Sequence, residues 1–190
     1  MNELQLIRDQ VATERRHMGE VAGACREALE RSPAGDTSLD ELCQAAAAYL
    51  VWIAGRFNAQ DQAHCDLLRP RLTADDAADH RILDDLEATL RENRVAIGRL
   101  DAALQARQAG RMHAAEFVGA CRDDLRFYDD VLLQRRHVIH HLFDRHYGIE
   151  EWRRASLVDA DSIVEERSRY ARVRTKLPPG VELVAARPPE

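Results

Sequence analysis

Two histidines, His17 and His80, each lie in a segment that predicts a helix, and a second long helix follows each of them. The following helices carry polar residues four positions apart, which places each pair on one helix face. These pairs are Gln60 with His64, and Asp130 with Gln134. A single His on the first and third helices, with a spaced ligand pair on the second and fourth, is how a four-helix bundle holds a metal ion in its core.

The composition bounds the classes of function. The 190 residues carry a net charge of −6, from 33 acidic and 27 basic residues, so no basic face predicts nucleic-acid binding. No run of about 18 apolar residues predicts a membrane span. The start, Met1-Asn-Glu-Leu, lacks the basic and apolar regions of a signal peptide. We therefore expect a cytoplasmic protein that acts without nucleic acid or membrane.

Apolar residues at helical spacing predict four long helices, over roughly residues 3–31, 38–69, 73–110 and 112–146. Ser38 with Glu41 predicts a capping box at the start of the second helix. Connections of a few residues imply antiparallel neighbours, so the fold class is all-α, an up-down-up-down antiparallel four-helix bundle over residues 1–155. A short helix is predicted within about residues 150–172, and an extended Pro-rich C-terminal arm follows it. Residues 156–190 are assigned to this helix and arm, outside the bundle.

The four cysteines are scattered over the predicted helices, with Cys25 in the first, Cys43 and Cys65 in the second, and Cys121 in the fourth. None has a spacing typical of a metal site, which favours reduced, buried thiols that act as small apolar residues. Cys65 differs from the others in following His64 directly.

Four segments resemble the hemerythrin-like (HHE cation-binding) domain family. Two are the helix openings Glu14-x-x-His17 and Asp79-His80-Arg, and the third runs from Gln60-Asp-Gln-Ala-His-Cys to Leu72. The fourth is residues 135–152, which resembles the end of the family's fourth helix and the Glu-Glu-Trp turn that follows it. The resemblance covers most of the chain and is architectural.

The resemblance implies an ion pocket supplied by His on helices one and three and by His-x-x-x-Glu on helices two and four. His17 and His80 fit the single-His positions. On helix two the family's His falls at Gln60 or Asp61, and its Glu at His64 or Cys65. On helix four the Glu falls at Arg135 or Arg136, and a guanidinium has no lone pair to offer a metal.

Four interpretations of this pocket follow. In the first, His17, His64, His80 and Asp130 hold one iron or zinc ion, with Gln60, Asp61 and Gln134 as further ligands or orienting groups. In the second, no metal binds, and Arg135 forms an ion pair with Asp61, Glu87 or Asp124. The third is a two-iron centre with substituted ligands. The fourth is a haem, or a resemblance without functional meaning.

Two functions follow from these interpretations. A bound ion with an open coordination position predicts a module that binds or senses a small diatomic ligand, O₂ or NO, or the redox state. Without an ion, the bundle is a protein-interaction or dimerisation module, and a homodimer formed through a helix face suits it. An enzyme ranks last, because no nucleophile, general acid or cofactor loop supports one specifically.

Overall fold

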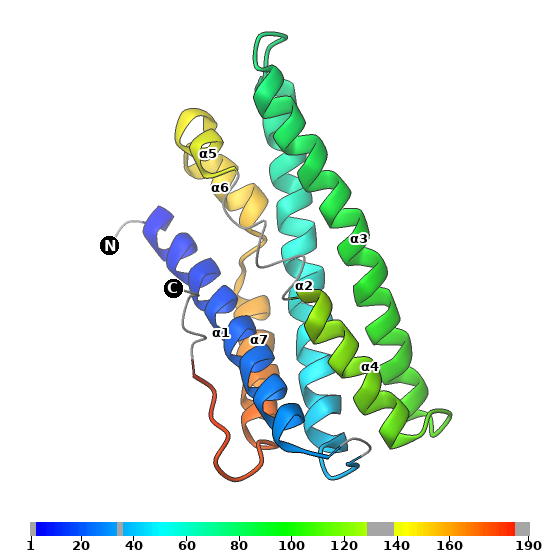
Figure 1. Cartoon of the computed structure of the whole chain (residues 1–190). Coiled ribbons are helices and arrows are strands. Elements are labelled where there is room, and N and C mark those ends of the chain that lie inside the picture. Colours follow the sequence, from blue (N-terminus) through cyan, green and yellow to red (C-terminus); the bar gives the residue numbers. More distant parts are fainter. Residues whose placement is uncertain (1–2, 34–35, 129–138, 185–190) are drawn as a thin grey trace.

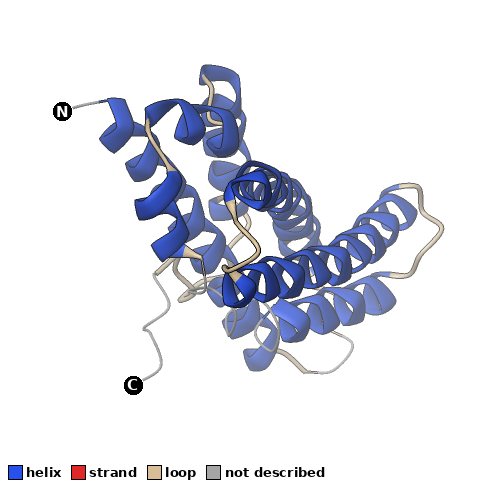
Figure 2. Cartoon of the chain, turned by 90° about the horizontal axis from the view of Figure 1, so that it is seen from above, coloured by secondary structure: helices blue, strands red, loops and turns tan. Residues whose placement is uncertain are grey.

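The computed structural model describes residues 3–33, 36–128 and 139–184, and all its regular elements there are helices (Figure 2). The α-helices are α1 (Glu3–Arg31), α2 (Asp40–Leu68), α3 (Ala77–Gln108), α4 (Ala114–Phe127), α5 (His140–His146), α6 (Ile149–Ser156) and α7 (Ala160–Arg174), with a 3₁₀ turn η1 (Arg69–Arg71) after α2. The prediction of an all-α chain is confirmed. No helix in the described ranges is both long and apolar enough to cross a membrane.

The central element of the fold is α2, which packs against α1, α3, α4, α6 and α7 (Figure 1). Its sequence Ala45-Ala-Ala-Ala48 combines high helix propensity with small side chains, so neighbouring helices can approach its backbone closely. Gln60 and His64, whose spacing predicts that they face the core, are both buried, as are Tyr49 and Ile53 on the same helix.

Helix boundaries follow local chemistry, with one correction. The Ser38–Glu41 capping box does not form: α2 begins at Asp40, and the Ser38 N–H donates to the Asp36 carboxylate instead. The end of α3 agrees with the prediction. Gly110 adopts a φ of +69° there, which a residue without Cβ reaches at little cost, and the N–H of Arg111 bonds back to the Ala106 carbonyl.

The predicted fourth helix, 112–146, corresponds to α4 and α5 in the described part of the chain. Residues 129–138 between them lie outside the described residues, so Asp130, Gln134, Arg135 and Arg136 do too. The expected helix within 150–172 is divided into α6 and α7. Leu157 joins them with a left-handed φ of 51°.

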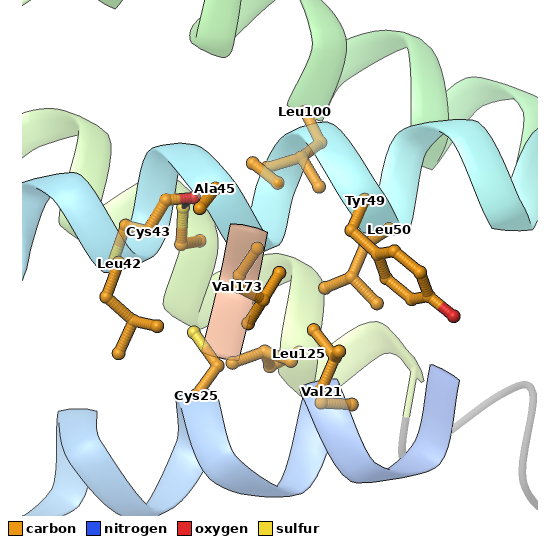
Figure 3. Packing of buried hydrophobic residues seen from close by; sticks show 14 of the residues in the cluster. Val21, Cys25, Leu42, Cys43, Ala45, Tyr49, Leu50, Leu100, Leu125 and Val173 are labelled. Carbon is orange, nitrogen blue, oxygen red and sulfur yellow. Dashed lines mark hydrogen bonds between the residues drawn. The ribbon is translucent and has the colours of Figure 1, made fainter. Parts of the chain in front are cut away.

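The main hydrophobic core lies between α1, α2, α4, α7 and the C-terminal half of α3 (Figure 3). Val173 of α7 and Val181 beyond it are buried in this core, and the Arg31 side chain donates to the Gly180 carbonyl at 2.8 Å. The segment up to residue 184, which the sequence assigns to a separate helix and arm, thus shares the core of residues 1–155. A second, smaller core surrounds Leu68, Leu83 and Leu142.

Candidate functional site

The polar centre of the molecule is Glu166 on α7, whose side chain is only 1% exposed. One carboxylate oxygen, Oε1, accepts the Tyr49 hydroxyl at 2.9 Å and lies 2.9 Å from Nδ1 of His17. Since Tyr49 is on α2 and His17 on α1, a single oxygen ties three helices together. Burial and the neighbouring Glu166 carboxylate raise the pKa of Tyr49, which keeps its hydroxyl as a donor.

The ring of His17 is held on its other side by Tyr170, one turn after Glu166. The two rings stack with centroids 4.0 Å apart and planes 17° from parallel. The Tyr170 hydroxyl donates to the Glu20 carboxylate, and burial together with this bond raises the pKa of Tyr170. The orientation of His17 is therefore fixed by α7.

A second buried carboxylate, Glu14, lies one turn before His17 and is fully buried. Its carboxylate oxygens accept two hydrogen bonds from the Arg56 guanidinium, at 3.0 and 3.3 Å. They accept a third from the Gln10 side-chain amide, at 3.1 Å. Arg56 also donates to the Leu157 carbonyl at 2.8 Å. This ion pair links α1 and α2 to the junction of α6 and α7, and a buried charge needs such a partner.

His64 lies near the C-terminal end of α2, away from Tyr49. Its side chain is inside an aromatic cluster formed by α5 and α6. Its Nδ1 is 3.0 Å from the Tyr147 hydroxyl, and its ring centroid is 4.5 Å from that of Phe143 and 5.7 Å from that of Trp152. Gln60, one turn earlier, donates to the Ser156 carbonyl. Gln60 and His64 both point inward as predicted. Gln60 holds α6 against α2, and His64 holds the end of α5 against it.

The other two described ligand candidates have partners near the surface. The Nε2–H of His80, at the first turn of α3, donates to the Thr73 carbonyl at 3.2 Å. Asp61 pairs with Arg15 at 3.3 Å. Of the acidic residues considered as partners of Arg135, Glu87 lies 3.2 Å from Arg69, and the charge of Arg99 acts on Asp124.

Among the ligand candidates that the structure describes, His17 and His64 do not converge on one point. His17 shares an oxygen with Tyr49, and His64 comes fifteen residues later on α2, which is about 22 Å at 1.5 Å per residue. Two imidazoles on one ion must bring their nitrogens within about 4 Å of each other. In the described ranges, no group of three or more His, Cys, Asp or Glu side chains is placed to hold a metal ion. These residues therefore do not fit the three-histidine site.

Sequence reasoning missed Glu166 and Tyr170 as the partners of His17, and Tyr49 as the second donor to Glu166. A signal for α7 exists, because Ile163, Glu166, Tyr170 and Val173 recur at helical spacing and define one face. Nothing in that face identifies His17 as the partner of Glu166, because these two residues are 149 positions apart in the sequence.

Three of the four cysteines meet in the main core, which their sequence spacing did not indicate. Cys25 of α1, Cys43 of α2 and Cys121 of α4 are all buried, and the neighbouring Cys43 thiol raises the pKa values of the Cys25 and Cys121 thiols. Cys65 is also buried, but in the second core, where burial raises the pKa of its thiol to about 12.

Comparison with known proteins adds no assignment: no family model, curated protein or solved structure matches this chain.

Proposed function

We propose that this chain is a metal-independent helical module that acts through protein interaction. The observation that carries the proposal is the role of its inward histidines. His17 ties α1 to α7 through Glu166, and His64 ties α2 to α5 and its neighbours through Tyr147. Each thus serves as a cross-link between helices, the task that a core ion performs in a metal-holding bundle.

Under this proposal the chain retains the antiparallel helix order of a hemerythrin-like four-helix bundle and works in the cytoplasm. Its partner is a protein, and a second copy of the chain is the first partner to test. Sedimentation equilibrium of the purified protein measures this directly. A dimer at micromolar concentration supports self-association, whereas a monomer up to about 100 µM excludes a physiological homodimer.

The histidine roles are tested by thermal unfolding of two matched variants. His17→Ala removes the contacts with Glu166 and Tyr170 and leaves a buried carboxylate oxygen with one donor fewer, so we expect a loss of about 1–3 kcal/mol. His113→Ala, at an exposed position, should change stability by less than about 0.5 kcal/mol.

Added Fe²⁺, kept anaerobic, or Zn²⁺ separates the proposal from its rival. A ligand that binds only the folded state raises the unfolding temperature. We expect neither ion to raise it in the wild-type protein. A rise that His17→Ala abolishes and His113→Ala retains would refute the metal-independent function.

The second candidate function is ion binding of the hemerythrin-like type, with O₂, NO or redox sensing. One observation favours it: Nδ1 of His17 is held by a buried carboxylate, the contact that orients metal-binding histidines in many proteins and leaves Nε2 as the ligating atom. Iron or zinc would then need further ligands brought to His17 from other residues.

A further inference from the structure

The Cys25–Cys43–Cys121 cluster brings together reactive groups that the proposed function does not use. The three thiols come from α1, α2 and α4, so any bond between two of them would join two helices. Figure 3 shows Cys25 pointing from α1 into the core, toward the helix that carries Cys43. The Cys121 thiol also lies 3.9 Å from the Cys43 carbonyl oxygen, which places it against the same turn of α2.

The arrangement has one hub. Both other thiols act on the Cys43 thiol and lower its pKa, and the Arg122 guanidinium nearby acts in the same direction. The same contacts, together with burial, raise the pKa values of Cys25 and Cys121. Cys43 is therefore the common neighbour of the other two thiols, and a thiolate is the form of a cysteine that reacts with oxidants.

We propose that Cys43 is the hub of a peroxide-responsive thiol site, which forms a disulfide with either Cys25 or Cys121. This site is independent of whether the histidines bind a metal. Its output is mechanical, because a Cys43–Cys25 bond fixes α2 to α1 and a Cys43–Cys121 bond fixes α2 to α4.

The chemistry takes two steps and needs one hydrogen peroxide. The Cys43 thiolate attacks a peroxide oxygen, so an S–O bond forms, the O–O bond breaks, and the departing hydroxide takes a proton to become water. The sulfur of Cys25 or Cys121 then attacks the sulfenic acid, an S–S bond forms, and the hydroxyl leaves with the thiol proton as water. Two thiols lose two electrons, and one peroxide becomes two waters.

Access requires local opening, because each of the three side chains is at most 5% exposed. Small oxidants reach buried thiols when a helix moves away transiently. The rate of oxidation should therefore increase in mild denaturant, below the unfolding transition.

The test is peroxide treatment of the full-length protein, followed by differential alkylation and peptide mapping. We expect the wild type to lose two of its four thiols, with Cys43 in every disulfide. Alanine is the replacement of choice, because it suits an apolar core, and far-UV circular dichroism checks that each variant is folded before oxidation.

The single variants identify the hub. Cys25→Ala and Cys121→Ala should each still form one disulfide, because Cys43 keeps one partner. Cys43→Ala should form none, and Cys65→Ala should behave as the wild type. A Cys25–Cys121 disulfide in folded Cys43→Ala would overturn the proposal, as would a folded wild type whose three clustered thiols stay reduced.

Discussion

At the residue scale, the buried carboxylates decide how the helices are held. Glu14 and Glu166 are each fully or almost fully removed from solvent, and each is satisfied by donors from other helices. Losing one donor of such a group costs more than the bond itself contributes, because the remaining polar atom is left desolvated. Substitutions at these two residues are therefore expected to be destabilising.

Glu166→Gln tests this sensitivity with almost no change in volume. The amide presents one acceptor oxygen and an NH₂ group, which cannot accept, in place of two equivalent oxygens. We expect a loss of about 1–3 kcal/mol in the free energy of unfolding, measured by urea titration. Glu165→Gln is the matched control, since its exposed pair with Arg169 is worth less than about 1 kcal/mol. Equal effects of the two substitutions would contradict the structural role of Glu166.

Asp124 provides a pH-dependent prediction. Burial raises the pKa of its carboxyl to about 6, from about 3.9 in an unfolded chain. Between these values the folded protein holds a proton that the unfolded protein releases, so this contribution to stability is full below about pH 4 and is lost as the pH rises through 6.

Asp124→Asn removes that titration. We expect the variant to be more stable than the wild type by about 1–2 kcal/mol at pH 7.5 and equal to it near pH 4. Asp123→Asn is the control, because its side chain is 79% exposed and should give a pH-independent difference close to zero. A wild-type advantage at pH 7.5 would show that Asp124 is stabilised as an anion.

At the element scale, the junction between α6 and α7 carries backbone strain. Leu157 has a φ of 51°, which is uncommon for a residue with a side chain, and its carbonyl is fixed by Arg56. The junction brings Glu166 and Tyr170 against α1 and α2, so its geometry matters for the whole polar centre.

Substitutions at Leu157 separate strain from packing. Leu157→Gly removes the Cβ that disfavours this conformation, and the original side chain is 41% exposed, so stability should stay within about 0.5 kcal/mol of the wild type. Leu157→Val adds a β-branch and should cost about 1–2 kcal/mol in thermal unfolding. The opposite order would mean that the leucine side chain, rather than φ, dominates at this position.

Helices α1, α2 and α3 could be predicted, because apolar periodicity, Pro33, Pro70 and Gly110 are local signals. The division of the expected helix within 150–172 into α6 and α7 could not. The inward direction of Gln60 and His64 followed from the same periodicity. Their partners could not be predicted, since Ser156 and Tyr147 are more than eighty residues away and belong to α6 and the end of α5. The ligand set based on the resemblance placed His17 beside His64. In the antiparallel packing of α1 against α2, however, the two histidines lie at different levels along α2.

At the scale of the whole molecule, the C-terminal segment is part of the fold. Figure 1 shows α7 alongside α1, and its Val173 is completely buried in the main core. The sequence predicted a short helix and a Pro-rich arm outside the bundle here, and α7 has a single narrow apolar face among many charged residues. The core contribution of that face becomes visible only when α1 and α2 are placed around it.

Two valines of α7 test this integration. Val173→Ala opens a cavity in the main core and should cost about 2 kcal/mol. Val164→Ala, at a position 67% exposed, should have an effect within about 0.5 kcal/mol. Unfolding followed by both circular dichroism and tryptophan fluorescence should give one coincident transition for the Val173 variant. A small early transition, with residues 3–128 unaffected, would mean that α7 folds as a separate unit.

The central claim is that His17 acts as a cross-link between helices and not as a metal ligand. The most direct measurement is elemental mass spectrometry of the untagged protein, purified without chelator, beside His17→Ala and His113→Ala. We predict far less than one transition-metal ion per chain in all three proteins. One or two iron or zinc ions per chain, absent from His17→Ala and present in His113→Ala, would contradict the claim and establish a metal centre at His17.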